Sequence, residues 1–539
     1  TDKVEGYCLG NRSLPWWAIG LSVMATQMSA VTLVGTTGQA YLTGLRFVQF
    51  YFGLPLAMVI LCLTAVPIYR RMRVFTAYEY LEQRFDLKTR SLGASLFLVQ
   101  RGLAAGITIY APALILSVAL GWDVHGTVML IGVLVVAYTA WGGTRAVGYT
   151  HVLQMAIIWG GMLTVSALVL RALPHGLSLP EVLHVTGGLG RLRAVDLSFD
   201  PANRYNLWSG LIGGMFLALS YFGTDQSQVT RYLAGQSVAQ SRLGLLTNGL
   251  VKVPMQFGIL FLGTLVFAFY LFTTPPLCFD PVATARIERS PYAAQYHALE
   301  ADHRAAAAER ERWARELIAA RRAGSAEGVA AARHSLQHAQ GELEAVRGQA
   351  VALMRRQDPR APASDTNYIF LTFVLRVLPA GVVGLVLAAV FAASMSSTSS
   401  ELSSLASTSM VDVYKRLLRR RAEERGDVAV SRVLTLLWGA FAIGFAQYAD
   451  HLGSLIEAVN ILGSLFYGTI LGIFLVAFYL KRVGGTAVFW AAVAAEAGVL
   501  ACFRFTRISF LWYNVVGCLL VMGLAAALQP LVARRPARA

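Results

Sequence analysis

The chain has 539 residues, of which 56% are hydrophobic and only 14% are charged, and its formal net charge is +16. Soluble domains are roughly 45–50% apolar and about 25% charged, so this composition excludes an ordinary soluble protein. The basic residues fall in short runs between apolar stretches, a pattern that is typical of membrane loops and argues against a nucleic-acid-binding face. The sequence therefore predicts a polytopic membrane protein, with lipid as its surroundings and no nucleic-acid partner.

Apolar runs of about 20 residues, long enough to cross ~30 Å of hydrocarbon, recur along the whole chain. They predict an all-α fold with about twelve transmembrane helices. The expected spans are 14–35, 47–68, 92–120, 126–141, 147–172, 206–223, 243–272, 380–411, 428–448, 453–480, 485–503 and 508–531.

Loops that are rich in Lys and Arg alternate with loops that have almost none. If every span crosses once, the basic loops all lie on one side, which the positive-inside rule identifies as the cytoplasm. We therefore expect a multi-pass protein of a bacterial inner membrane. The basic loop residues are Arg70, Arg71, Arg73, Arg84, Lys88, Arg90, Arg231, Arg242, Lys415, Arg416, Arg419, Arg420, Arg421, Arg425, Lys481, Arg482, Arg534, Arg535 and Arg538.

One long segment, residues 279–365, does not have membrane composition. It is rich in Ala, Arg, Glu and Gln, and helix-forming residues run from 290 to 322 and again from 329 to 356. Gly324 and Gly328 interrupt the pattern between the two runs. The segment is expected to form an extracytoplasmic helical hairpin, either a docking arm for another protein or a solvated insertion without a partner.

Polar residues gather where lipid-compatible residues are expected. The first span contains Thr26, Gln27, Ser29 and Thr32, and the eighth contains a dense hydroxyl run at residues 394–401. Small hydroxyl residues allow helices to pack closely. Hydroxyl and freed carbonyl oxygens can also replace the hydration shell of a hard cation such as sodium. The residue types alone leave both interpretations open.

The first and sixth spans both contain a polar interruption. It covers Ala25 to Ser29 in the first span and Leu219 to Gln226 in the sixth. The two spans stand five apart and begin on opposite sides of the membrane. Paired broken helices in two inverted halves indicate the midplane site of a secondary transporter. No nucleophile-elbow, phosphate-loop or metal-ligand motif indicates an enzyme.

Six stretches in this order resemble motifs of the sodium:solute symporter family, whose members carry sugars, proline, sialic acid, iodide or monocarboxylates. Apart from residues 279–365, the resemblance runs from about residue 7 to residue 482. The stretches are Tyr7 to Trp17, Thr76 to Phe85, Trp141 to Val147, Gly223 to Gln226, Arg231-Tyr232, and Leu378-Pro379 through Ser396-Ser397 to Val411-Asp412-Val413-Tyr414.

The resemblance implies an inverted five-plus-five helix repeat of the LeuT type, followed by two further helices. The expected divisions are 1–278 for the first repeat and the start of the second, 279–365 for the hairpin, 366–480 for the remainder of the second repeat, and 481–539 for two peripheral helices with a basic tail. The function it implies is sodium-coupled import of a small solute by alternating access. A transporter-like receptor and a proton-coupled carrier are the alternatives.

The family's shared sodium site maps onto residues that were already unusual on physical grounds. The resemblance implies that sodium binds the backbone carbonyls of Ala25, Met28 and Ala393 and the hydroxyls of Ser396 and Ser397. This match favours ion coordination over helix packing as the role of the hydroxyl run.

A second sodium site is put in doubt by His151, which stands where many family members have Asp. Imidazole prefers softer metals than sodium, although Ser399 and Ser400 of that site are present. A histidine can titrate near neutral pH, so His151 is either a proton-carrying group or a hydrogen-bonded residue at a helix start.

The solute is expected to bind between the broken spans. Gln27 and Thr32 are the first candidates for polar contacts, and Tyr221 and Phe222 resemble the aromatic pair beside the family's sugar site. Lys252 is either a solute ligand or a side chain that reaches to the interface. The expected solute is a monocarboxylate, a sugar or another anion.

Overall fold

The computed structural model describes residues 14–72, 74–358, 364–418 and 424–533. This part of the chain is helical and contains no β-strand, apart from one isolated bridge between Leu14 and Gly235. Some predicted features lie outside it. They are residues 7–13 of the first motif and the basic residues Arg73, Arg419, Arg420, Arg421, Arg534, Arg535 and Arg538.

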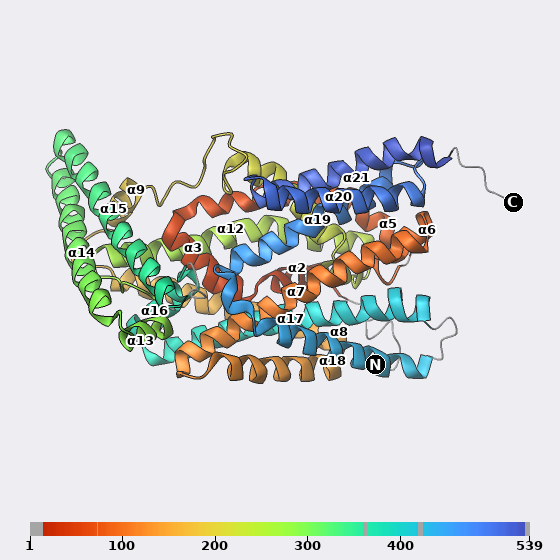
Figure 1. Cartoon of the computed structure of the whole chain (residues 1–539), viewed down its shortest axis with the longest axis horizontal. Helices are drawn as coiled ribbons and strands as arrows, with labels where there is room; N and C mark the ends of the chain where they lie inside the picture. The colour runs from red at the N-terminus through yellow and green to blue at the C-terminus, as the bar shows by residue number, and fades with distance from the viewer. Residues whose placement is uncertain (1–13, 73, 359–363, 419–423, 534–539) are drawn as a thin grey trace.

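The first part of the chain, as far as residue 188, forms the start of a helical bundle (Figure 1). Its elements are α2 (Trp16–Gln27), η2 (Val31–Gly35), α3 (Thr36–Thr43), η3 (Gly44–Tyr51), α4 (Leu54–Leu63), α5 (Ala65–Met72), α6 (Ala77–Arg84), α7 (Leu87–Leu120), α8 (Val124–Ala172) and α9 (Leu179–Gly188).

The second part, from residue 209 onward, completes the bundle and carries the hairpin. Its elements are η4 (Ser209–Gly213), α10 (Gly214–Gly223), α11 (Gln226–Leu233), α12 (Val238–Leu271), α13 (Pro281–Glu288), α14 (Ala293–Arg322), α15 (Ala326–Gln357), α16 (Thr366–Val377), α17 (Ala380–Thr408), η5 (Ser409–Leu418), α18 (Glu424–Ala446), η6 (Ala449–Leu452), α19 (Leu455–Tyr479), α20 (Gly485–Phe505) and α21 (Phe510–Ala533).

Short polar side chains begin several of the long helices. Asp86 accepts a hydrogen bond from the amide of Thr89 at the start of α7, and Asp123 accepts one from Gly126 at the start of α8. Ser237 caps α12 in the same way. Such caps satisfy amide groups that have no partner within the helix, so they fix where each helix starts.

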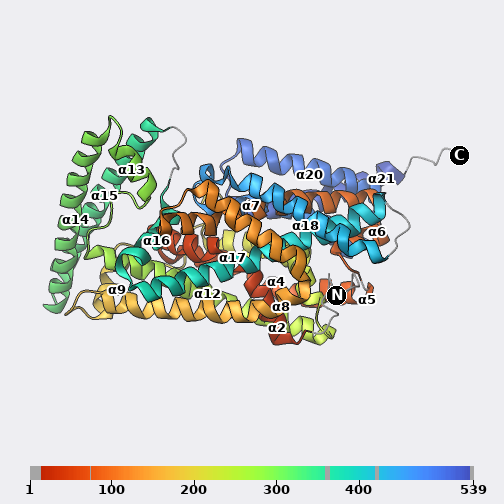
Figure 2. The same cartoon turned by 90° about the horizontal axis from the view of Figure 1, so that it is seen from below.

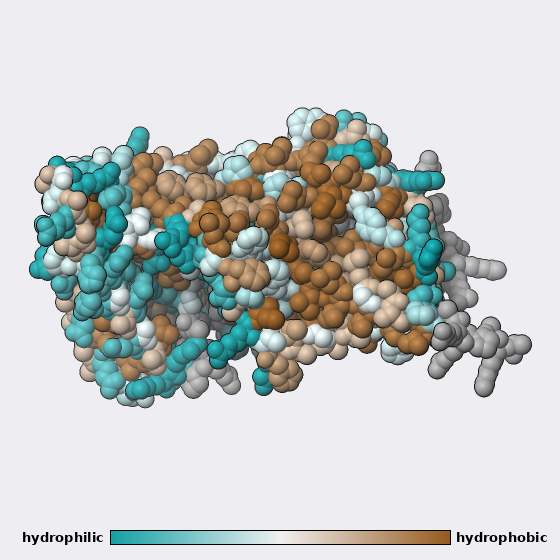
Figure 3. Space-filling model, turned by 90° about the horizontal axis from the view of Figure 1, so that it is seen from above, coloured by the Kyte–Doolittle hydropathy of each residue, from teal (hydrophilic) through white to brown (hydrophobic). Residues whose placement is uncertain are grey.

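Ten helices of the described residues are long and apolar enough to cross a membrane. Two shorter apolar helices, Ser209–Gly223 and Thr366–Val377, accompany them. Figure 3 shows hydrophobic side chains over the middle of the molecule and hydrophilic ones at its two ends. This distribution fits a multi-pass protein whose apolar band lies in lipid.

The fourth and fifth predicted spans are both present, as Val124–Trp141 and His151–Ala172, but they belong to one helical element, α8, which runs without a break from Val124 to Ala172. The element is nevertheless not straight. The hydroxyl of Tyr138 donates to the carbonyl of Met395, and Gly161 approaches Ala389 of the same helix, α17. On a straight helix, positions 138 and 161 would be ~34 Å apart, while 389 and 395 are ~9 Å apart. The two apolar halves of α8 therefore bend sharply toward each other and serve as two spans.

The segment between α12 and α16 projects from one end of the bundle (Figures 1 and 2). There α14 and α15 lie side by side as two long antiparallel helices, at the end of the molecule away from α6 (Figures 1 and 2). Gly324, with φ +69°, forms the turn between them. The predicted second interruption at Gly328 is wrong, because α15 begins at Ala326 and the amide of Gly328 donates to its cap, Ser325.

Candidate functional site

Two broken helices meet in the middle of the bundle. α2 ends at Gln27, and Met28, with φ −85° and ψ 89°, leaves the helical conformation before η2 continues the chain. The second break separates α10, which ends at Gly223, from α11, which starts at Gln226. Both breaks lie where the polar interruptions were predicted. They free backbone carbonyls that an unbroken helix would use internally.

The five residues predicted to bind sodium form one cluster between the break of α2 and helix α17. Ser396 Oγ lies 3.3 Å from the carbonyl oxygen of Ala25, and Ser397 Oγ lies 3.2 Å from that of Met28. Ser397 Oγ also donates to the carbonyl of Ala393 at 2.8 Å. All five residues are buried. Three carbonyl and two hydroxyl oxygens form the donor set that a hard cation prefers.

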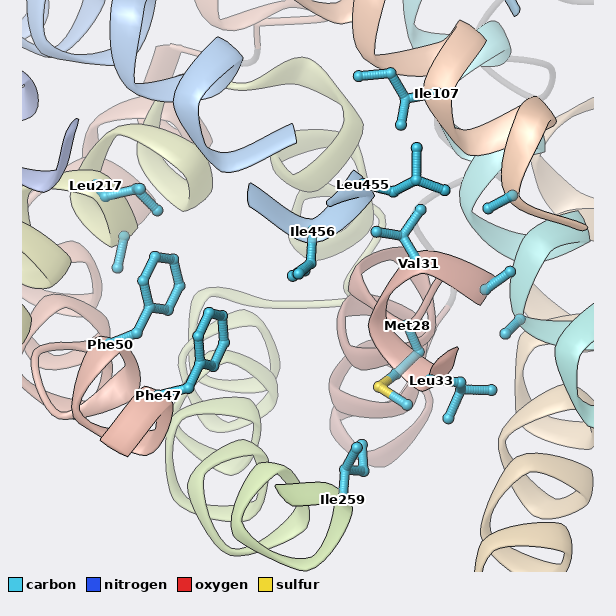
Figure 4. Packing of buried hydrophobic residues seen from close by; sticks show 14 of the residues in the cluster. Met28, Val31, Leu33, Phe47, Phe50, Ile107, Leu217, Ile259, Leu455 and Ile456 are labelled. Carbon is cyan, nitrogen blue, oxygen red and sulfur yellow. The ribbon is translucent and has the colours of Figure 1, made fainter. Parts of the chain in front are cut away.

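A cavity of about 130 Å³ lies beside this cluster. A water molecule needs only ~10–15 Å³ by the same measure, so the cavity has room for a small solute. Figure 4 shows three residues that line the cavity: Ile456 is in the centre of the view, with Phe50 and Leu217 on one side of it and the break at Met28 on the other. All five predicted solute residues line it: Gln27, Thr32, Tyr221, Phe222 and Lys252.

Polar contacts hold several of these lining residues in place. Gln27 donates through Nε2 to the side-chain oxygen of Asn248 at 3.1 Å. Thr32 donates its hydroxyl to the carbonyl of Gln27 at 3.1 Å, which bridges the break of α2. The rings of Tyr221 and Phe222 contact each other edge to face, with centroids 5.0 Å apart. These contacts fix the positions of the four side chains in the cavity wall.

Lys252 contributes a buried positive charge to the cavity. Its side chain comes from α12 and is only 1% exposed, so it does not reach to the interface. The ammonium lies 3.3 Å from the sulfur of Met28 and 5.8 Å from the ring centroid of Tyr51. Among the residues that the structure describes, no carboxylate lies within 4.0 Å of it. A cation without a counter-charge at this depth is costly, so it is a strong candidate ligand for an anion.

Sequence reasoning missed a second charged group in the cavity wall. Arg101 of α7 pairs with Asp225 at the α10–α11 break and with Glu401 of α17, the latter at 3.0 Å. The hydroxyl of Tyr467 joins them, 2.6 Å from Arg101 Nη2 and 3.0 Å from Asp225 Oδ2. The signal was present, because Arg101 and Glu401 lie inside predicted spans and Asp225 lies in the predicted interruption of the sixth, and ionisable residues in such positions are a functional hypothesis by default.

The predicted second-site residues are only partly brought together. His151 is fully buried, and its Nδ1 lies 2.9 Å from the hydroxyl of Ser22. Thr26 donates to the carbonyl of Ser22 and lies 3.3 Å from Ser400 Oγ, so a chain of polar groups joins His151 to Ser400. Ser399 instead donates to the carbonyl of Ser396 in its own helix. A proton role for His151 stays a prediction.

Aromatic rings close the cavity on the side of α9 and the hairpin. Phe50 and Tyr51 line the cavity, and their ring centroids are 4.9 Å apart. Phe47, which is fully buried, stacks on Phe50 at 5.5 Å and contacts Tyr205 at 4.9 Å. Tyr205 in turn lies beside the ion pair of Arg204 and Glu457. A solute that enters from this side must pass the layer formed by these four rings.

Comparison with protein families gives a match to the model described as "Sodium:solute symporter family", over residues 7–296 and 352–494. Residues 297–351, which form most of α14 and α15, are outside the match.

Similar proteins include the human sodium/iodide cotransporter, which is 34% identical over 51% of this chain and 42% of its own length. The sodium-coupled monocarboxylate transporter 1 of Xenopus laevis is 26% identical over 87% of this chain and 62% of its own. The chain thus spans less than two thirds of these two relatives. The sodium/sialic acid symporter NanT of Aliivibrio fischeri is 24% identical over 96% and 86%.

Among solved structures, a Na+-coupled sialic acid symporter in a substrate-bound outward-open state matches with a TM-score of 0.74. The match covers 98% of this chain and 93% of that one, at 21% sequence identity. At this identity the likeness establishes the shared fold, an all-α transporter bundle, and nothing about the solute.

Proposed function

This chain belongs to the sodium:solute symporter family, and on that premise we propose that it couples sodium entry to the import of a small monovalent anion by alternating access. A monocarboxylate is the solute class that we favour. The protein is a multi-pass membrane protein of a family of transporters. Its basic loops suggest the inner membrane of a bacterium, with these loops in the cytoplasm.

The unpaired charge of Lys252 is the observation that carries the anion assignment. An anion next to its ammonium would supply the counter-charge that the described residues around it do not. The cavity, at about 130 Å³, suits a small carboxylate better than a bulky sugar acid. Relatives named as iodide and monocarboxylate transporters agree with a small monovalent anion.

Two residues link the ion cluster to the solute cavity. Met28 offers its carbonyl to the sodium cluster, while its sulfur touches Lys252. Ser397 belongs to the cluster and also lines the cavity. Sodium at the cluster would hold α17 against the break of α2 and thereby fix one wall of the solute site. Separation of these two helices toward the cytoplasm would release both.

The number of sodium ions decides how far an anion can be accumulated. A tenfold sodium gradient is worth about 1.4 kcal/mol, and one charge crossing ~100 mV about 2.3 kcal/mol. One sodium with one monovalent anion moves no net charge, which limits accumulation to about tenfold. A second sodium would raise the limit to about 5,000-fold.

Sodium-22 and solute uptake into proteoliposomes tests the proposal across a panel of monocarboxylates, halides, sugars and amino acids. We expect sodium-dependent uptake of a monocarboxylate, which falls at least about tenfold in Lys252→Gln. We expect the double variant Ser396→Ala, Ser397→Ala to lose sodium dependence. Ser404→Ala removes a hydroxyl from the same helix outside the cluster and should behave as wild type.

The panel also separates the alternatives. Uptake of a sugar with Lys252→Gln fully active would refute the anion assignment. Full sodium dependence in the double serine variant would refute the ion site. Tight solute binding without any uptake would favour a receptor that acts through a partner, for which the hairpin is a candidate docking arm.

A further inference from the structure

A second, larger cavity lies between α9 and the hairpin. Its volume is about 660 Å³, several times that of the central cavity. Its lining includes no aspartate or glutamate among the described residues. The charged and polar side chains in its wall are Arg46, Arg193, Arg321, Arg333, His184 and Gln337.

The four arginines of this outer cavity differ from their neighbours. Arg191 pairs with Glu344 at 3.0 Å, and Arg322 pairs with Glu181 at 2.6 Å. In the part of the chain that the structure covers, Arg46, Arg193, Arg321 and Arg333 have no carboxylate within 4.0 Å. Up to four positive charges thus line one space without a carboxylate in contact, and Asp196 is close enough to Arg46 for the two charges to attract each other.

His184 of α9 provides a second sign that the site is incomplete. Its Nε2 is buried and has no hydrogen-bond partner among the described residues. Burial, together with the positive charges of Arg321 and Arg333, lowers the pKa of this imidazole. This enclosed atom therefore has capacity for one hydrogen bond that the described residues do not make.

The backbone holds the two sides of the cavity together. Gly44, at the start of η3, has φ +72°, and a Cβ there would lie 2.2 Å from the carbonyl oxygen of Arg191. The same carbonyl accepts a hydrogen bond from the amide of Leu45, which fixes Arg46 beside the loop that carries Arg193. On the hairpin side, Gln337 donates to the carbonyl of Gly188 at 2.9 Å.

The outer cavity leads toward the central one. Arg46 and Gly190 line both the outer cavity and a neighbouring cavity whose wall includes Tyr205 and Glu457. Tyr205 is the outermost ring of the aromatic layer above the central cavity. A solute in the outer cavity is therefore on the entrance side of that layer.

We propose that the outer cavity is an anion-capture site, which binds small oxyanions of the carboxylate or phosphate class and concentrates the anionic solute at the entrance. That the captured solute is also the transported one rests on the proposed function. A concave surface with one sign of charge raises the local concentration of an oppositely charged ligand. Arg321 and Arg333 belong to the stretch 297–351, so the capture site is an addition to what the family model matches.

Binding of inorganic phosphate to the purified chain, followed by 31P line broadening, tests the site without transport. The double variant Arg321→Gln, Arg333→Gln should lose most of the broadening. Arg304→Gln removes an exposed hairpin charge that faces Glu300, not the cavity, and should bind as wild type. Wild-type broadening in the double variant would overturn the proposal. Loss of broadening in Lys252→Gln would place the anion in the central cavity and overturn it as well.

Transport provides the second measurement. The double variant should raise KM for the anion about threefold to tenfold at low ionic strength with kcat unchanged, and added salt should abolish the difference. An unchanged KM, or the same rise in Arg304→Gln, would overturn capture. If the chain takes up no anion while phosphate binding still depends on the two arginines, the proposed function fails and the outer site stands.

Discussion

Arg101 of α7 and Lys252 of α12 both line the central cavity, and their surroundings differ completely. Arg101 contacts two carboxylates and a tyrosine hydroxyl, which join α7, the α10–α11 break, α17 and α19. Lys252 contacts a methionine sulfur and the face of a tyrosine ring. A buried cation with its charge matched holds helices together, whereas a buried cation without a partner is prepared for a ligand.

The stability of two variants tests this contrast most strongly. We expect Arg101→Met to lower the free energy of unfolding by about 3–5 kcal/mol, because it leaves Asp225 and Glu401 buried without a counter-charge. Lys252→Met should keep or raise it, because the substitution removes a charge that has no partner. Thermal unfolding in detergent, followed by tryptophan fluorescence, measures both. A similar loss in the two variants would contradict the contrast.

His151 extends the comparison to a basic group whose Nδ1 contacts a hydroxyl, that of Ser22, rather than an acid. We expect His151→Asp to complete a second sodium site and to raise the sodium:solute ratio measured by dual-isotope uptake. A second ion is worth up to about 3.7 kcal/mol of additional driving force. His151→Asn, which adds no charge, is the control. An unchanged ratio in His151→Asp would end the second-site idea.

His303, in the hairpin outside the membrane, is another buried basic group. It is buried in α14, and burial, reinforced by Arg347 and Arg310, lowers its pKa from 6.5 to about 4. Between pH 4 and 6.5, the imidazole of His303 is therefore neutral in the folded hairpin and protonated in the unfolded chain. The free energy of unfolding of the hairpin should therefore have its full value above pH 6.5 and fall by about 2–3 kcal/mol as the pH drops toward 4.

Hydrogen exchange of the hairpin between pH 4 and 7, corrected for the intrinsic rate, would measure this loss. His303→Gln should flatten the profile in this window. His338→Gln, at a largely exposed position of α15, should leave the profile unchanged. A slope that persists in His303→Gln would assign the pH dependence to another group.

Local sequence signals predicted the parts of the site that depend on local structure. Ala393, Ser396 and Ser397 are spaced three and four residues apart, so one face of a helix had to carry them. The break of α2 followed from polar residues inside an apolar span. Both are properties of a few consecutive residues, and the family resemblance joined them across the chain.

Pairings between distant helices could not be predicted in this way. Arg101 meets residues that lie 124 and 300 positions further along the chain, and nothing in the local pattern specifies that distance. The continuous helicity of α8 is a local property, yet it was not predicted either. Residues 142–146 lay between the predicted spans 126–141 and 147–172, although glycine within a helix costs only about 1 kcal/mol against alanine. The outer cavity likewise depends on how the hairpin docks on α9.

The double membership of Ser397, in the ion cluster and in the cavity wall, has a thermodynamic consequence. If sodium raises the affinity for the solute by some factor, the solute must raise the affinity for sodium by the same factor. Equilibrium titrations in either order should therefore yield one coupling free energy, on the order of 1–3 kcal/mol. Ser397→Ala removes the hydroxyl that belongs to both sites. It should therefore reduce by the same factor the effect of sodium on solute affinity and the effect of the solute on sodium affinity.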